Sequence, residues 1–368
     1  GFERIKAADM IDCYNFEDRK LVEIVKATYF NPKIVVIDET TTALSQEGRE
    51  ELYKHMERIR KSGNTVIFIS HDLPEIIEKS DTITILRDGV YIDTVKSKDV
   101  NENDLKKLMV GREVTGDYYR SDYGEKISDE VVLSAKHVTV PGLIEDVSFD
   151  LHKGEILGFG GLSESGMHEI GKAIFGASYD REGTVELADG TQINDIPTAI
   201  KHSIAYTSKD RDNESVVLNQ SIGDNICLPS LDELSGPAHL ISDKKKKDFA
   251  NKFAKQMSVK MVDVNQFVSN LSGGNKQKVV LARWIGKDSD IVVLDSPTRG
   301  IDIKVKQDIY QLMNQMRKNG KSIIMISEEL MELIGMCDRI MIMKDGKISG
   351  ELERDQNLDE NGLITMMV

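Results

Sequence analysis

Residues 290–346 read DIVVLDSPTRGIDIKVKQDIYQLMNQMRKNGKSIIMISEELMELIGMCDRIMIMKDG, and residues 33–89 read KIVVIDETTTALSQEGREELYKHMERIRKSGNTVIFISHDLPEIIEKSDTITILRDG. The two stretches align without a gap, so that Asp38 corresponds to Asp295 and Gly63 to Gly320, each pair 257 residues apart. Chance does not explain so long a register. The chain therefore contains a tandem duplication, and each copy should repeat one structural unit.

Each copy alternates short apolar runs with helical patterns. Runs such as IVVID (34–38) and TVIFIS (65–70) are rich in β-branched residues and do not alternate with polar ones, which is typical of buried parallel strands. The residues between them, 46–62, form a helical pattern that ends at Gly63. Such units predict a doubly wound α/β fold, whose ligands bind beyond the carboxyl ends of the strands.

The two copies differ in what precedes them. Only 13 residues precede Tyr14, whereas the matching Leu271 of the second copy follows a much longer segment. Residues 111–131 between the copies are polar, rich in Gly and Asp, and lack apolar periodicity. We therefore expect an incomplete first domain over 1–110, a linker over 111–131 and a second domain over 132–368. The residues after Asp129 have an alternative interpretation as an edge strand of the second domain.

Composition narrows the class of protein. A formal net charge of −14 argues against a nucleic-acid binder, which normally carries a basic surface. The three cysteines are widely separated and do not form a metal-binding pattern. No apolar run approaches the ~20 residues that a membrane-spanning helix needs. These features favour a globular protein of a reducing compartment.

The strongest chemical motif is LSGGNKQKVVLARWI (271–285), which begins 24 residues before Asp295. A serine and two glycines at a helix start offer a hydroxyl and backbone N–H groups to a phosphate. Glycine also lets the backbone approach a ligand closely. Followed by a strand that ends in aspartate, the motif predicts a nucleotide site.

A second motif, GFGGLSESGMHEIGKAIFG (158–176), follows a strand as a phosphate-binding loop does. The P-loop pattern G-x-x-x-x-G-K-[ST] requires a lysine and a hydroxyl residue after its second glycine. Here Gly161 and Gly166 are followed by Met167 and His168. The stretch has the position of a P-loop without its charged and hydroxyl side chains.

Together these motifs resemble the ATP-binding cassette (ABC) proteins, and more narrowly the fused, two-cassette ATPases of monosaccharide importers for ribose, galactose or xylose. The resemblance covers essentially the whole chain and includes LSGGNKQK, SPTRGID, VSFDLHKGEILG, MVGRE and LVEIVKA. It implies P-loop NTPase-like α/β cassettes in tandem, the first incomplete. In such proteins one cassette supplies the P-loop, the Walker B strand and a switch histidine to each site, and the other supplies the LSGG-type signature.

The resemblance assigns one competent site. Asp38 would hold Mg²⁺ through water, Glu39 would act as general base, and His71 would contact the γ-phosphate of ATP. The opposing signature would come from the second copy: Ser272, Gly273, Gly274, Asn275 and Gln277. The P-loop of this site would lie before residue 1. We therefore expect a fragment of a protein of roughly 500 residues, as the resemblance implies, that is inactive alone.

The same comparison predicts that the other site is degenerate. Met167 replaces the P-loop lysine, and His168 replaces the hydroxyl residue that ligates Mg²⁺. Ser296 follows Asp295 in place of a catalytic glutamate, and Glu328 stands at the switch-histidine position. Opposite them, Asn15 and Glu17 fall in a sequence that replaces the signature, with Glu17 in place of a glycine. We expect no catalysis there, and nucleotide binding through the backbone of 161–166 stays open.

The family resemblance also implies partners. These are two integral membrane permease subunits and, indirectly, a periplasmic or extracellular sugar-binding protein, with the ATPase on the cytoplasmic face of the membrane. Residues 208–212 (SKDRD) match the region where membrane subunits dock, and Lys209 replaces the glutamate common there. The alternatives are a nucleoside importer of the same subfamily, a soluble ABC ATPase of translation or DNA repair, and a non-catalytic regulatory protein.

Overall fold

The computed structural model describes residues 5–14, 16–38, 40–44, 46–70, 72–87, 90–110, 118–123, 126–162, 164–236, 239–301, 303–355 and 358–367. The chain divides into two compact units. Unit 1 comprises residues 1–115 with 302–304, and unit 2 comprises residues 116–301 and 305–368. Each is described by itself below.

Unit 1 is a small α/β unit. Its helices and strands are α1 (Phe16–Thr28), β1 (Ile34–Asp38), α2 (Gln46–Lys61), β2 (Thr65–Ile69), α3 (Leu73–Lys79), β3 (Thr82–Arg87), β4 (Val90–Lys96) and α4 (Glu102–Val110). β1 and β2 pair in parallel across α2, and β3 and β4 form an antiparallel hairpin. The strand–helix–strand arrangement predicted for this copy is confirmed, and α2 ends two residues before Gly63, whose φ is +82°.

One face of the β1–β2 pair differs from expectation. Leu52 of α2 and alternate residues of β1 are buried in a small core. The opposite face is apolar and exposed, with Ile34 at 59% and Val36 at 58%. The corresponding strand of unit 2 is buried throughout because α5 packs against its equivalent face. A run without polar alternation therefore predicted the strand correctly but not its burial.

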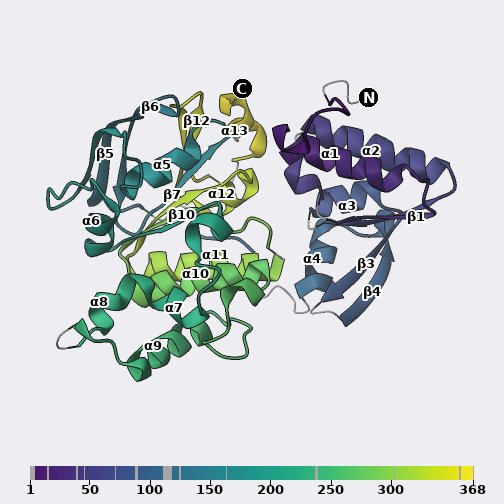
Figure 1. The fold of residues 1–368 in the computed structure, drawn as a ribbon. Helices are drawn as coiled ribbons and strands as arrows, with labels where there is room; N and C mark the ends of the chain where they lie inside the picture. Colours follow the sequence, from purple (N-terminus) through teal and green to yellow (C-terminus); the bar gives the residue numbers. More distant parts are fainter. Residues whose placement is uncertain are drawn as a thin grey trace. The chain divides into compact units, whose positions relative to one another are not determined.

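Unit 2 is the larger body (Figure 1). Its first elements are β5 (Val131–Val140), β6 (Ile144–His152), β7 (Ile156–Gly161), α5 (Met167–Ile174), β8 (Glu182–Leu187), α6 (Ile196–Lys201), β9 (Ile204–Thr207), α7 (Ile222–Cys227), α8 (Leu231–Leu234) and α9 (Asp243–Gln256). They are followed by α10 (Gly273–Lys287), β10 (Ile291–Asp295), α11 (Ile303–Lys318), β11 (Ser322–Ile326), α12 (Leu330–Met336), β12 (Arg339–Lys344), β13 (Lys347–Glu353) and α13 (Glu360–Met367).

A six-stranded sheet with the order β13-β12-β7-β11-β10-β9 forms the centre of unit 2. Its strands are parallel except β13, which runs antiparallel to β12. Helix α5 lies between this sheet and a separate antiparallel sheet with the order β6-β5-β8. Helices α7, α9 and α10 pack together and form what we call the helical part of unit 2 (Figure 1). The carboxyl ends of β7, β10 and β11 meet at one edge, where such folds bind ligands.

The helical part is joined to the sheet by a buried arginine on α10. The Arg283 guanidinium donates to the carbonyl oxygens of Ser215 at 2.6 Å and Asn225 at 2.7 Å. Burial lowers the pKa of Arg283 to about 10, so the side chain is still charged at neutral pH. Because α10 carries the signature motif, this anchor fixes the motif relative to residues 211–215.

The duplication is visible in a repeated hydrogen-bond network. In unit 2 the fully buried Glu332 accepts from Thr298, Tyr310 and Ser327 at 2.6, 2.5 and 2.9 Å. In unit 1 Glu75 accepts from the residues at the same relative positions: Thr41, Tyr53 and Ser70. The strand registers also agree, because Asp38 pairs with Ile69 as Asp295 pairs with Ile326. Both copies are therefore built on one plan.

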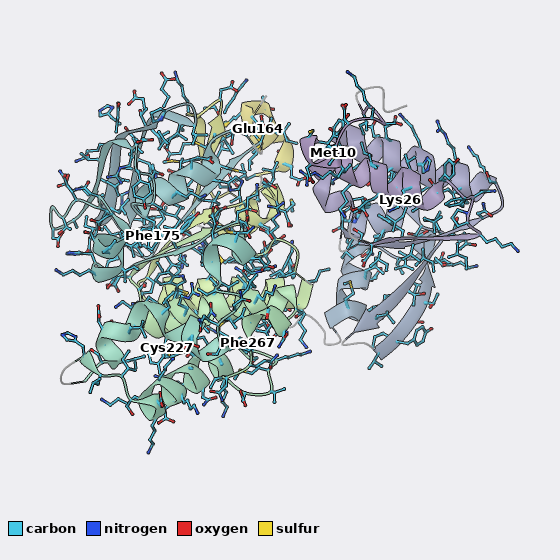
Figure 2. The ribbon with its side chains drawn as sticks, viewed as in Figure 1. Met10, Lys26, Glu164, Phe175, Cys227 and Phe267 are labelled. Carbon is cyan, nitrogen blue, oxygen red and sulfur yellow. The ribbon has the colours of Figure 1, made fainter. Side chains whose placement is uncertain are left out.

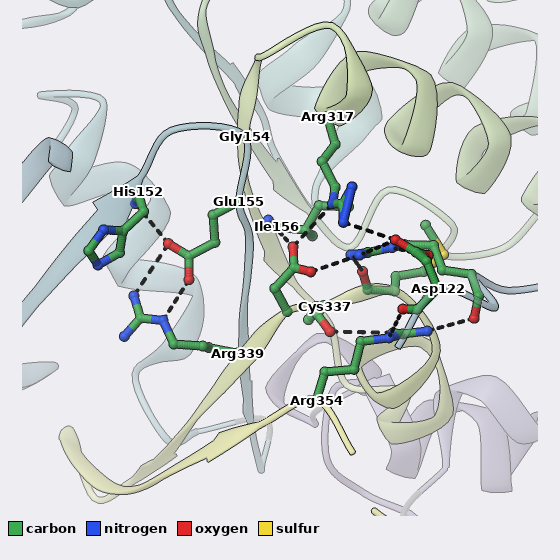
Figure 3. Close-up of polar contacts among 12 residues, drawn as sticks. Asp122, His152, Gly154, Glu155, Ile156, Arg317, Cys337, Arg339 and Arg354 are labelled. Atoms are coloured by element: carbon green, nitrogen blue, oxygen red, sulfur yellow. Dashed lines mark hydrogen bonds and ion pairs between the residues drawn. The ribbon is translucent and has the colours of Figure 1, made fainter. Parts of the chain in front are cut away.

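Residues 118–123, from the stretch predicted to be the linker, pack into unit 2. Arg120, with a side chain 1% exposed, donates to Asp338 at 2.7 Å and to Asp122 at 2.8 Å. Arg317 also bonds Asp122, at 2.9 Å, and Arg354 donates to the carbonyl oxygen of Arg120 (Figure 3). A buried arginine with paired carboxylates anchors this segment beside the start of β12.

Candidate functional site

Two glycines flank the loop between β7 and α5, at positions 161 and 166. At Gly166 φ is +90°, and a Cβ there would lie 2.6 Å from the carbonyl oxygen of Leu143. At Gly161 a Cβ would lie 2.3 Å from Ser165 Oγ. Only glycine fits these two positions. The two glycines of the motif thus lie at the end of β7 and at the N-cap of α5, where other residues would be strained.

The side chains on this loop do not suit a phosphate. Met167 is fully buried and brings no positive charge to the loop. Glu164 is exposed on the same loop, at the end of unit 2 opposite Cys227 and Phe267 of the helical part (Figure 2). Its carboxylate would repel an incoming polyphosphate. The sequence reasoning missed Glu164, although a charged residue inside a glycine-rich loop was a readable signal.

Four side chains, from the carboxyl ends of four sheet strands or the segments that follow them, meet beside the loop. We call His168, Lys209, Asp295 and Glu328 the polar cluster. His168 Nδ1 lies 2.7 Å from Asp295 Oδ1, and His168 Nε2 lies 3.4 Å from Glu328 Oε1. Lys209 Nζ donates to Glu328 Oε1 at 2.7 Å and lies 3.1 Å from His168 Nε2. Of the residues predicted for the degenerate site, the structure therefore brings His168, Asp295 and Glu328 together, with Lys209 as a fourth member.

Charge within the polar cluster is balanced by protein groups. Burial opposes the charged form of His168, but hydrogen bonds to Asp295 and Glu328 outweigh it and raise the pKa of the imidazole. Two basic side chains, His168 and Lys209, therefore face two carboxylates. Asp295, 1% exposed, also accepts weak contacts from Ser296 Oγ at 3.3 Å and the Tyr206 hydroxyl at 3.4 Å. The carboxylates of Asp295 and Glu328 already bond the two basic side chains, which leaves neither base available to pair with a phosphate.

Residues 208–215 connect the polar cluster to the signature helix. Lys209 reaches Glu328, as described above, and three residues later Asp212 accepts from Lys276 of α10 at 2.8 Å. Local hydrogen bonds stabilise the turn of this segment: Asn213 N donates to Asp210 Oδ1, and Val216 N donates to the carbonyl oxygen of Arg211. This segment therefore bridges the sheet edge and the first turn of α10.

The signature residues lie at the N-terminus of α10. Ser272 is its exposed N-cap residue, and Gly273 and Gly274 form the first turn. The first N–H groups of a helix have no intrahelical acceptor and, with the helix dipole, favour an anion. Asn275 donates to Ser272 Oγ at 2.9 Å, whereas Gln277 is buried. The turn can accept a phosphate from outside unit 2.

In unit 1 the structure places part of the predicted competent set. Asp38 is the exposed last residue of β1, and its carbonyl oxygen accepts from Thr40 Oγ1 at 3.2 Å. Glu39 and His71 lie outside the described residues, as does Asn15. Glu17 lies in the first turn of α1, the element that aligns with α10, and its side chain is outside the description. The predicted roles of these residues stay predictions.

The residues of the polar cluster do not fit a magnesium–nucleotide complex. The side chain at the lysine position is apolar, and the carboxylate of Asp295 is already bonded by His168. Among the described residues, no group of three or more His, Cys, Asp or Glu side chains is placed to hold a metal ion.

A separate search concerned membrane-spanning helices. Among the residues that the structure describes, no helix is both long and apolar enough to span a membrane.

Comparison with known proteins agrees with the motifs. The ABC transporter family model matches residues 144–299. The chain is 41% identical over 344 residues to a ribose import ATP-binding protein of Lactococcus lactis, covering 93% of this chain and 69% of that protein. It is 42% identical over 350 residues to a xylose import ATP-binding protein of Thermoanaerobacter pseudethanolicus, covering 92% and 68%. Among solved structures, the dimeric bacterial ABC transporter cassette MJ0796 superimposes with a TM-score of 0.54 at 22% identity, over 61% of this chain and 99% of that one.

Proposed function

The chain belongs to the ABC transporter family, and from that premise we propose that it is the ATP-binding subunit of a monosaccharide importer, coupling ATP hydrolysis to uptake. The observation that carries this proposal is the signature turn of α10, whose N-cap residue Ser272 is exposed. The sequence comparison supports it, because the chain is 41% and 42% identical to a ribose and a xylose import ATP-binding protein. Those relatives cover sugars of one chemical class, and neither is named for a nucleoside.

The two units contribute different parts to one working site in this proposal. Unit 1, corresponding to the first cassette at 1–110, supplies Asp38, Glu39 and His71. Unit 2, corresponding to the second cassette at 132–368, supplies the signature turn at Ser272–Gly274. The site around the polar cluster, for which Asn15 and Glu17 align with the signature positions, is the degenerate one in this proposal.

The chemistry follows from the parts. Asp38 would hold Mg²⁺, which would supply positive charge to the phosphates of ATP. Glu39 orients the attacking water and accepts its proton, while His71 contacts the γ-phosphate. The first-turn N–H groups of α10 and the helix dipole stabilise the negative charge on the transferred phosphoryl group. The signature turn is open to such an anion because Ser272 is exposed at its start.

The transport step requires other subunits. In the proposed complex the chain lies on the cytoplasmic face of the membrane, against two integral membrane permease subunits. A sugar-binding protein outside the membrane delivers the substrate to those subunits and selects the sugar. Residues 208–212 are the proposed docking region, because they lie between the sheet and the helical part and connect to both.

An uptake assay tests the function and separates it from nucleoside import. In a strain that lacks the gene, we expect the wild-type protein to restore uptake of a labelled pentose or galactose, with unlabelled nucleosides in excess as competitors that have no effect. A Glu39→Gln variant should fail to restore uptake. Restoration of nucleoside uptake alone would favour the alternative, and full activity of Glu39→Gln would contradict the catalytic assignment.

A further inference from the structure

The polar cluster occupies the place where the family resemblance puts Mg²⁺ and the terminal phosphate. His168 stands at the metal-ligating hydroxyl position, and Glu328 stands at the switch-histidine position. In this chain the two are bonded to protein groups instead, His168 to Asp295 and Glu328 to Lys209, at 2.7 Å each. The elements that a magnesium–nucleotide complex would bridge are thus bridged by side chains.

The bridge continues away from the sheet. Lys209 belongs to residues 208–215, and this segment also bonds α5, because Lys172 donates to Glu214 at 2.8 Å. On its far side Asp212 accepts from Lys276 at 2.8 Å, in the turn that follows Ser272. A Cβ at Gly273 would lie 3.1 Å from Arg211 Nη2, so the segment also touches the signature turn.

Partial burial strengthens the hydrogen bonds of the polar cluster. The side chain of Lys209 is 24% exposed and that of Glu328 is 37% exposed, while His168 and Asp295 are nearly enclosed. Charge-assisted hydrogen bonds that are partly shielded from water are stronger than exposed ion pairs. The polar cluster therefore holds residues 208–215 against the sheet edge.

We propose that the polar cluster replaces magnesium and nucleotide in unit 2, and that Lys209 is a positioning residue that holds residues 208–215 and the signature turn of α10 in place without nucleotide. This inference rests on the proposed function, in which unit 2 supplies the signature to the working site. The polar cluster does not catalyse hydrolysis. It keeps the signature turn of α10 in the conformation that the working site needs.

Hydrogen exchange of the protein, without membrane subunits, tests the proposal. The variant is Lys209→Met, and the control is Lys321→Met, which removes a lysine of similar exposure that pairs with Asp288 at 3.0 Å and Asp290 at 2.9 Å, at the opposite end of α10 from the signature turn. Loss of one charged hydrogen bond should make opening about tenfold more frequent. We expect that increase in the exchange of residues 208–216 and 272–279 in Lys209→Met only.

Two further variants keep the test decisive. Glu328→Gln removes the charge of the partner with little change in shape, and should accelerate exchange in the same two segments. The charge swap Lys209→Glu with Glu328→Lys should return exchange to near the wild-type rate. In the wild type, Mg·ATP should leave the exchange of residues 164–170 unchanged, because the polar cluster already occupies the site.

The outcomes separate this inference from the proposed function. Exchange at 272–279 that is no faster in Lys209→Met than in Lys321→Met overturns the positioning role. Protection of 164–170 by Mg·ATP overturns the replacement of nucleotide. Neither readout requires transport or hydrolysis, so failed sugar uptake bears on the proposed function alone.

Discussion

Replacing Arg120 by methionine should destabilise unit 2 strongly. The guanidinium is 1% exposed and bonds Asp338, Asp122 and the carbonyl oxygen of Met336, the last at 2.8 Å. Methionine fills a similar volume but leaves these carboxylates with fewer partners. Breaking a buried ion pair by removing one partner costs about 3–5 kcal/mol. Arg317 still reaches both carboxylates, so we take about 3 kcal/mol, the low end of that range.

The assay is thermal unfolding, followed by calorimetry or circular dichroism. For a unit of this size 1 kcal/mol shifts the melting temperature by about 2–4 °C, so Arg120→Met should lower it by about 6–12 °C. Lys126→Met is the matched control, because Lys126 lies three residues beyond this segment and pairs with Asp129, and both side chains are more than four-fifths exposed. Its shift should be close to zero. Equal shifts in the two variants would refute the conclusion that residues 118–123 are anchored in unit 2.

Three further predictions concern stability and reactivity. Tyr310→Phe removes a hydrogen bond to the buried Glu332 and should cost about 1.5–3 kcal/mol, measured by urea unfolding against the exposed control Tyr179→Phe; an unchanged midpoint would contradict the network. Burial alone would raise the pKa of Asp122, but the hydrogen bond from Arg120 lowers it to about 2. The ionised carboxylate therefore contributes its full stabilisation above pH ~4 and loses it as the pH falls towards 2. The melting temperature of Asp122→Asn should depend less on pH between these values than that of the wild type. Iodoacetamide should label Cys13 first, because it is exposed, whereas Cys227 and Cys337 are buried and burial raises the pKa of Cys227 to about 11; equal labelling of all three in the native protein would contradict the fold.

Much of the fold could be predicted because the sequence repeats itself. The alignment of the two copies predicted that each would repeat one strand–helix–strand unit, and the parallel pairs β1–β2 and β10–β11 have the same register. The glycines at 161 and 166 predicted a tight loop before α5, and the structure requires glycine at both. These features are local, or follow from comparing one copy with the other.

Other features depend on contacts that no sequence pattern records. Lys209 and Glu328 are 119 residues apart, so their ion pair could be inferred only from two opposite charges at positions that both departed from the family. Arg120 lies in a polar segment without periodicity, which resembles a solvated linker until its carboxylate partners are seen. The exposed face of β1 has the same composition as the buried face of β10, and only the packing of a helix distinguishes them.

The central claim of the proposed function is that hydrolysis depends on the catalytic residues of the first copy, Glu39 among them, and not on the matching residues of the second copy. The measurement that tests it most directly is the ATPase rate of the assembled importer carrying Glu39→Gln or Ser296→Ala, the same position in the two copies. The account predicts that Glu39→Gln lowers the rate about 10²-fold or more, as loss of a general base does, while Ser296→Ala keeps the wild-type rate. Equal loss in both variants, or no loss in either, would contradict it.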